Sequence, residues 1–143
     1  MNVKQLSVFI ENNRGSLASF CDLLGQNDVD LIALSIADTT NFGVLRTIVS
    51  DTDKALALVR GAGYAVSVTE VLAVAVPDEP GGLAGALKLL NDNNLSIENV
   101  YSFVRNVGGN AVIIFRMEYP DRAGEVLSAA GIRLLTQDEV RHM

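Results

Sequence analysis

The segment Gly81-Gly82-Leu83-Ala84 repeats Gly15-Ser16-Leu17-Ala18 at a spacing of 66 residues, and this repetition decides the fold. The match stays in register further along the chain, where Leu89-Leu90 corresponds to Leu23-Leu24. After an insertion of two residues it continues at a spacing of 68 into the second half of each copy. A register that persists through several predicted elements indicates an internal repeat. We therefore expect two copies of one module.

The copies are predicted to occupy 1–68 and 69–143, and hydrophobic periodicity gives both the same order of elements, βαββαβ. That order is typical of an antiparallel sheet with both helices on one face. The predicted fold class is therefore α+β, with two ferredoxin-like modules in tandem. The predicted strands cover 5–10, 31–37, 43–49, a segment that begins at Tyr64, 71–76, 97–104, 110–117 and 132–135.

Three local features of the sequence lead to further expectations. Gly25 stands where the first helix needs a left-handed residue to end, and the polar segment Thr136 to Met143 is expected to fray. The strands 71–76 and 112–115 are apolar on both faces, although a strand with one exposed face should alternate apolar and polar residues. We therefore expect the two copies to join edge to edge and the open sheet face to meet a second chain in a homodimer.

Composition excludes several classes of function. The 143 residues suffice for about one domain or two small ones, and the net charge of -6 argues against binding to nucleic acid. A single cysteine, Cys21, and a single histidine, His142, exclude disulfide frameworks, zinc ribbons and Ser-His-Asp triads. Accordingly, we predict no catalytic residues, no metal site and no cofactor.

The sequence shows neither a secretory signal nor a membrane segment. Residues 1–5 lead directly into a predicted strand, without the apolar core of a signal peptide. The longest purely apolar run, 71–76, is far shorter than the roughly 18 residues that span a bilayer. A cytoplasmic protein is expected.

Several families share the βαββαβ order, and site residues must separate them. An RNA-recognition module needs exposed aromatic residues and a basic surface, whereas aromatic residues make up only 6% of this acidic chain. A metal-carrier module needs a paired cysteine motif, and Cys21 stands alone. Arg14 lacks the glycine-rich surroundings of a phosphate-binding loop of the acylphosphatase type.

The turn Asp78-Glu79-Pro80-Gly81-Gly82-Leu83 resembles the D-x-P-G-x-L turn of ACT domains, which are small amino-acid-sensing regulatory modules. The segment Asn94 to Val100 is similar to the second strand of that family, and the resemblance covers about Lys4 to Leu135 as a tandem pair. In the first copy, the equivalent turn Asn12 to Leu17 has neither the Asp nor the Pro of the motif.

The resemblance implies that an amino acid binds between modules, with the turn of one module facing the start of the second strand of another. Glycine lets the backbone approach a ligand closely, and the first N–H groups of the following helix can receive a carboxylate. The candidate ligand-binding residues of the first copy are Asn12, Asn13, Arg14, Gly15, Ser16, Leu17, Asp30 and Leu31. Those of the second copy are Asp78, Pro80, Gly81, Gly82, Leu83, Ser96 and Ile97.

Purely structural roles for these residues stay open. The side chains of Asn12 and Asp78 could cap a turn or helix rather than bind a ligand. Pro80 could serve only to preset the turn, and Arg14 could be a solvated charge.

The first hypothesis for function is a non-catalytic sensor that binds an amino acid and regulates a partner enzyme in trans. The alternative is a structural or interaction subunit with empty sites that docks on a partner enzyme. A third possibility, a small-molecule enzyme on this fold, has no recognisable general base or nucleophile in the sequence to support it.

Overall fold

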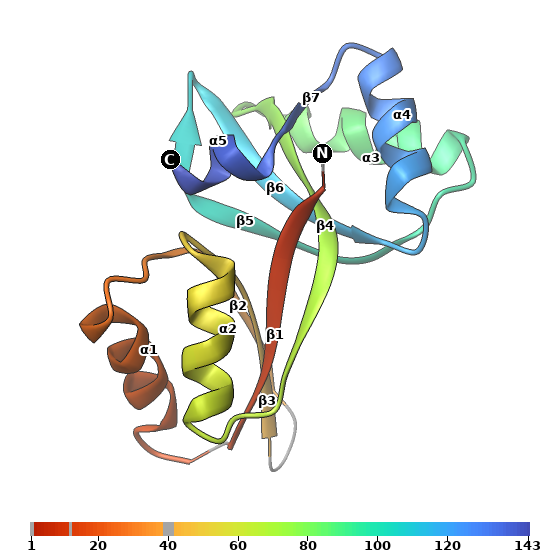
Figure 1. Cartoon of the computed structure of the whole chain (residues 1–143). Helices are drawn as coiled ribbons and strands as arrows, with labels where there is room; N and C mark the ends of the chain where they lie inside the picture. The colour runs from red at the N-terminus through yellow and green to blue at the C-terminus, as the bar shows by residue number, and fades with distance from the viewer. Residues whose placement is uncertain (1, 12, 39–41) are drawn as a thin grey trace. The chain divides into compact units, whose positions relative to one another are not determined.

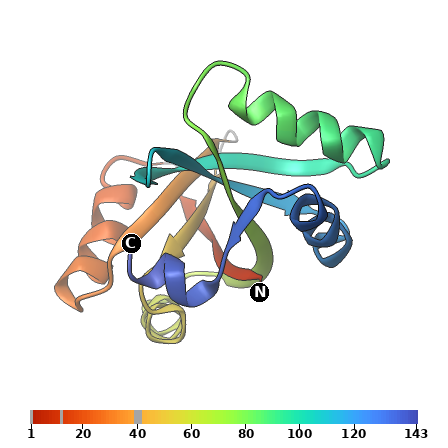
Figure 2. The ribbon, with the colours of Figure 1, turned by 90° about the horizontal axis from the view of Figure 1, so that it is seen from above.

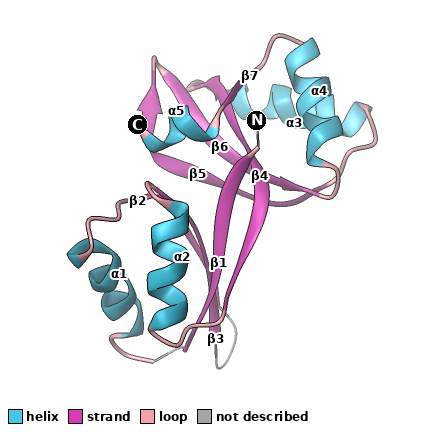
Figure 3. Cartoon of the chain, in the orientation of Figure 1, coloured by secondary structure: helices cyan, strands magenta, loops and turns pink. Residues whose placement is uncertain are grey.

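The computed structural model describes residues 2–11, 13–38 and 42–143, and the side chains of all of them except Asp38 and residues 104–107. The chain combines helices and strands in an α+β fold (Figures 1 and 3). It divides into two compact units. The first unit is Lys4–Thr69, and the second unit is Glu70–Met143 together with the N-terminal residues up to Val3. The module boundaries 1–68 and 69–143 stay a prediction.

The first unit is built on three antiparallel strands. Their order is β1 (Val3–Glu11), β3 (Phe42–Val49) and β2 (Leu31–Asp38). Helices α1 (Ser16–Gln26) and α2 (Thr52–Gly61) lie on the same side of these strands (Figure 1). The core lies between helices and strands and consists of Leu6, Val8, Ile10, Phe20, Leu24, Val29, Leu45, Val49, Ala55 and Val59.

The second unit repeats this arrangement, and Figure 2 shows its two main helices beside its strands. Its strand order is β5, β6, β4, β7. Strand β4 (Val66–Pro77) begins in the first unit and belongs to the second from Glu70 onward. The later elements are α3 (Gly82–Asp92), β5 (Ile97–Val107), β6 (Asn110–Met117), α4 (Pro120–Ala129), β7 (Arg133–Leu135) and α5 (Gln137–Arg141). Within the described chain, no helix has the length and apolar character needed to cross a membrane.

Capping residues fix where the helices begin. The carboxylate of Asp51 accepts a hydrogen bond from the backbone N–H of Lys54 at 3.2 Å, which caps α2. Pro120 occupies the first turn of α4, where a missing N–H costs nothing.

The predicted end of the first helix at Gly25 is wrong. Helix α1 continues to Gln26, and the left-handed residue that follows it is Asp28, with a φ of 59°. The second unit ends α3 in the same way, through Asn94 with a φ of 58°. Asp and Asn tolerate this conformation better than most residues, so the repeat uses them where glycine was expected.

Two other expectations are also wrong. The strands expected from Tyr64 and over 71–76 form one continuous strand, β4. The segment after Thr136 does not fray, because α5 forms there with a capping box between Thr136 and Glu139. Val140 of this helix is fully buried, and burial of an apolar side chain stabilises a helix too short to persist alone.

One face of the strands that are apolar on both faces packs in the core of the second unit, with Leu72, Val74, Val76, Ile113 and Phe115. Every residue of 71–76 is at most 8% exposed, as is every residue of 112–115. The homodimer stays a prediction.

Candidate functional site

The turns before α1 and α3 have the same backbone geometry. Gly15 has φ 87° and ψ -9°, and Gly81 has φ 86° and ψ -6°, which are left-handed values that glycine adopts readily. In each turn the first helical N–H bonds back three residues, from Ser16 to the Asn13 carbonyl at 3.2 Å and from Gly82 to the Glu79 carbonyl at 3.0 Å. The first copy therefore forms the turn without the Asp and Pro of the second.

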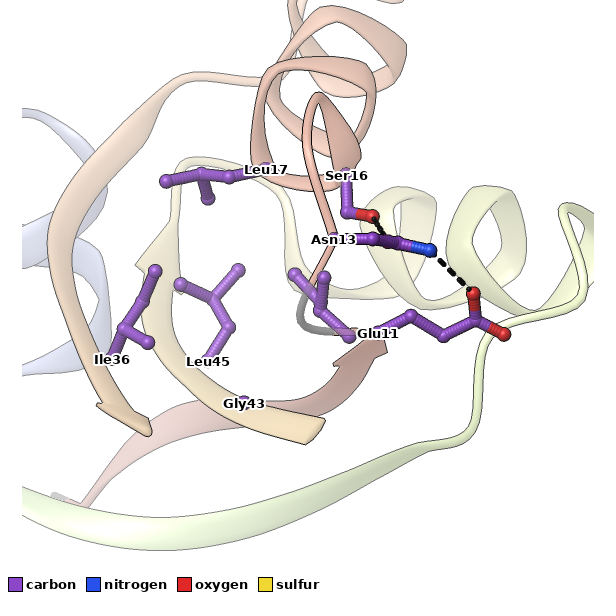
Figure 4. A pocket seen from close by; sticks show the side chains of 8 residues that line it. Glu11, Asn13, Ser16, Leu17, Ile36, Gly43 and Leu45 are labelled. Carbon is purple, nitrogen blue, oxygen red and sulfur yellow. Dashed lines mark hydrogen bonds between the residues drawn. The ribbon is translucent and has the colours of Figure 1, made fainter. Parts of the chain in front are cut away.

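A chain of polar side chains runs along the first turn. The Ser16 hydroxyl donates to Oδ1 of Asn13 at 2.6 Å, and Nδ2 of Asn13 donates to a carboxylate oxygen of Glu11 at 3.1 Å (Figure 4). Each bond fixes the orientation of the next group. Glu11 is the last of these three hydrogen-bonded residues, and it is exposed to solvent.

These polar groups line one side of a cavity of about 230 Å³, which we call the turn cavity. Its other lining residues are Ile10, Leu17, Ile36, Gly43 and Leu45. Figure 4 shows the apolar side chains on one side and the Glu11-Asn13-Ser16 chain on the other. The pairing of Ile36 with Leu45 across β2 and β3 puts both on the sheet face that carries the helices.

The turn cavity is suited to a small molecule with a polar and an apolar end. Drug-sized ligands occupy pockets of roughly 300 to 1,000 Å³, so a smaller ligand matches this one. The N–H groups of Leu17 and Ala18, in the first turn of α1, have no intrahelical acceptor and carry the positive end of the helix dipole. A carboxylate is favoured near them, and an ammonium near Glu11.

In the second turn, the start of the helix lies closer to the end of the preceding strand. A Cβ atom on Gly82 would lie 2.0 Å from the carbonyl oxygen of Pro77, whereas the equivalent position in the first copy carries the side chain of Ser16. Asp78 and Pro80 are exposed, and Leu83 packs against the core of the second unit. The two copies therefore differ at the place where both were expected to bind a ligand.

The structure brings together three of the candidate residues, since Asn13, Ser16 and Leu17 all line the turn cavity. Arg14 and Gly15 belong to the same turn and are exposed, but neither lines the cavity. Asn12 lies outside the described residues.

The candidates at the strand starts lie elsewhere within their units. Leu31 begins β2 opposite Val49 and packs on the core, while Ile36, at the cavity, lies five residues further along the strand. Asp30 is tied to Ser50, whose hydroxyl accepts its N–H at 2.9 Å. In the second unit, Ser96 is exposed before β5 and Ile97 packs against the core.

Sequence reasoning missed five lining residues of the turn cavity, namely Ile10, Glu11, Ile36, Gly43 and Leu45. Their membership depends on the register of β3 with both β1 and β2, and periodicity alone gives the face of a residue but not its partner. The polarity of Glu11 at a strand end was the one signal that could have drawn attention to it.

Among the described residues, no group of three or more His, Cys, Asp or Glu side chains could hold a metal ion. Burial raises the pKa of the Cys21 thiol, which lowers its nucleophilic thiolate fraction.

The whole chain, residues 1–143, matches the family model described as an ACT domain pair. A crystal structure of protein BT0572 from Bacteroides thetaiotaomicron is similar over 100% of this chain and 98% of that chain, with 36% identity and a TM-score of 0.93. No curated protein matches.

More distant structures share the fold. The ligand-free regulatory subunit of aspartate kinase from Thermus thermophilus is 13% identical, with a TM-score of 0.65 over 89% of this chain and 91% of that one. The corresponding subunit from Thermus flavus is 13% identical, with a TM-score of 0.63 over 92% and 94%. Since the family model spans both repeated turns and every element between them, the chain belongs to the ACT domain pair family.

Proposed function

We propose that the chain is a non-catalytic regulatory protein that binds an amino acid in the turn cavity and acts on a partner enzyme in trans. The observation that carries the proposal is the division of this cavity into a polar side, Glu11-Asn13-Ser16, and an apolar side that includes Ile36 and Leu45. An α-amino acid with an aliphatic side chain has the matching division.

The positions of the polar groups suggest how the carboxylate and ammonium ends of the ligand would be oriented. Its carboxylate would face the N–H groups at the start of α1, and its ammonium would face the carboxylate of Glu11. Its side chain would displace water from Leu17, which is 39% exposed, and from Ile36, which is 46% exposed. Burial of such exposed apolar surface favours binding.

Regulation in trans is consistent with the structural relatives. The Thermus thermophilus relative is named as the regulatory subunit of an enzyme, and its fold resembles this chain over most of both lengths. A ligand that binds one of two conformations more tightly changes their populations. We propose that amino-acid binding changes the affinity of this chain for its enzyme in that way.

The test is a thermal-shift screen against the twenty amino acids, followed by calorimetric titration of each one that raises Tm. A ligand at 100 times its Kd stabilises the native state by about 2.7 kcal/mol. We expect one or a few aliphatic amino acids to raise Tm and Asn13→Ala to weaken their binding. Glu79→Ala, at the equivalent position of the second turn, is the matched control and should bind normally.

Two results would contradict the proposal. A panel with no shift would favour the alternative of an interaction subunit, which pull-down of a partner enzyme would then examine. Equal loss of binding in Asn13→Ala and Glu79→Ala would place the ligand outside the turn cavity.

A further inference from the structure

A second hollow, of about 360 Å³, lies beside the end of β1, and we call it the aromatic hollow. Its lining residues include Phe9, Phe42 and Tyr64, together with Ile10, Glu11 and Ser16. The chain has only eight Phe and Tyr residues, so three of them gather in one small surface feature. Ala62, Gly63 and Ala65 complete its wall on the α2 to β4 connection.

Strand register explains how the rings come together. Glu11 is paired with Phe42 across β1 and β3, and Phe9 is paired with Val44. Residues two apart on a strand share a face, so Phe9, Glu11 and Phe42 lie on one face, and the two phenylalanines are diagonal neighbours about 7 to 8 Å apart. Large side chains at this distance reach one another.

Tyr64 is held in place from the other side. The Phe9 N–H donates to the Ala65 carbonyl at 3.0 Å, which brings the start of β4 beside β1. The Tyr64 ring also packs edge-on against Phe20, with a centroid distance of 5.4 Å and an interplanar angle of 81°. The Tyr64 ring therefore lies on the core side of the sheet, and Phe9 and Phe42 supply the rings on the open face.

Exposure of these rings is unusual for a packed fold. Phe9 is 52% and Phe42 50% exposed, although phenylalanine is among the residue types most often buried. Leaving two such rings in water costs free energy that a bound apolar surface would recover.

The charge of the hollow selects the kind of ligand. Among the described lining residues, Glu11 has the one carboxylate and there is no Lys, Arg or His, and the hydrogen-bond donor that Glu11 has there is the neutral amide of Asn13. Aromatic faces carry negative electrostatic potential and attract cations. A metal ion would need more oxygen ligands than one carboxylate, so rings and carboxylate together favour a cation with an apolar surface.

We infer that the aromatic hollow binds an organic ammonium ion, with its alkyl groups against Phe9 and Phe42 and its charge opposite Glu11. This site differs from the amino-acid site proposed above in its apolar contacts, which are Phe9 and Phe42 and not Leu17, Ile36 and Leu45, but the two sites share the carboxylate of Glu11, so their ligands would compete. Ile10, Glu11 and Ser16 border both sites.

The experiment is a titration of the whole chain with choline and, separately, with its neutral isostere 3,3-dimethylbutan-1-ol. Calorimetry measures the affinity, and NMR records the chemical shifts of the Phe9 and Phe42 rings. Choline should bind roughly three- to tenfold more tightly than the isostere, because the charge contributes only for choline. Equal affinity of the two compounds, or no binding of choline, would overturn the inference.

Variants separate the aromatic contribution from simple apolar contact. Phe9→Leu and Phe42→Leu keep an apolar side chain but remove the ring, and each should weaken choline binding severalfold while changing the affinity for the isostere little. Tyr119→Leu, which removes an exposed ring of the second unit, is the matched control and should bind choline as the parent does. Unchanged choline affinity in both Phe variants would contradict the site, provided that their melting curves show folded protein.

Discussion

The carbonyl oxygen of Pro77 occupies the place where a side chain on Gly82 would begin, since an ideal Cβ there would lie 2.0 Å from that oxygen. Real Cβ atoms do not approach backbone oxygens so closely, and backbone moves less readily than the end of a flexible side chain. The glycine after Gly81 is thus required by close approach and not by its own dihedral angles. The first copy has Ser16 at this position, so its strand end and helix start are further apart.

Substitution of Gly82 by alanine should lower the free energy of unfolding by about 1 to 3 kcal/mol, the usual cost of overpacking. Gly85→Ala is the matched control in the same helix, because a Cβ there meets no atom within 4 Å. Alanine has the higher helix propensity, so this control should be neutral or stabilising. Urea unfolding of both variants measures the difference, and equal stability would show that the turn relaxes without cost.

Much of the fold could be predicted from the repeat, because apolar periodicity and turn residues occur twice and support each other. The positions of the strands and helices followed from this pattern. The merging of two expected strands into β4 could not be predicted, because Glu70 interrupts the apolar pattern and so suggests a break. In the structure, the strand continues through Glu70. The last helix was missed because its stability comes from the burial of Val140, which a short polar segment does not reveal.

The candidate site was predictable only in part. The turn itself follows from Gly15 and the residues around it, since glycine marks the left-handed position. Whether the space under the turn is open depends on how strands β2 and β3 pair, which brings Ile36 opposite Leu45. The difference between the two turns likewise depends on the backbone of Pro77, whose approach to Gly82 is a tertiary feature.

The left-handed residue after α3 supports a second stability prediction. Asn94 has a φ of 58°, and most side chains pay roughly 1 to 2 kcal/mol there. We expect Asn94→Ala to destabilise the protein by about 1 kcal/mol and Asn94→Gly to leave stability nearly unchanged. Asn91→Ala, inside α3, is the control and should not destabilise. If Asn94→Ala unfolds at the same urea concentration as Asn94→Gly, the conformation contributes no strain.

Cys21 should react slowly with thiol reagents in the folded protein. Burial raises the pKa of its thiol above the ordinary value of 9.0, so at neutral pH less of it is thiolate than in an exposed cysteine. The rate with a chromogenic disulfide should rise when the chain is unfolded in guanidinium. A Ser19→Cys variant that also carries Cys21→Ser places a thiol at an exposed position of α1 and should react faster than Cys21 does. Equal rates would contradict the effect of burial.

The capping box of α5 should make the protection of this helix depend on pH. The pKa of Glu139 lies below its ordinary value of 4.5, first because its carboxylate accepts the Thr136 N–H and then because it bonds to Arg133. A carboxyl whose pKa is lowered by folding stabilises the fold above its unfolded pKa, and this contribution disappears as the pH falls through the lower folded value.

Amide hydrogen exchange of Val140, whose N–H donates to the Thr136 carbonyl at 3.0 Å, reports this contribution locally. Near neutral pH, the parent should protect this amide better than Glu139→Gln does, and the difference should close below pH 4.5 as Glu139 takes up its proton. High salt screens the exposed pair with Arg133 but not the bond to the Thr136 N–H. Part of the difference should therefore survive in 1 M salt. A difference that is constant with pH would show that the charge of Glu139 does not hold α5 in place.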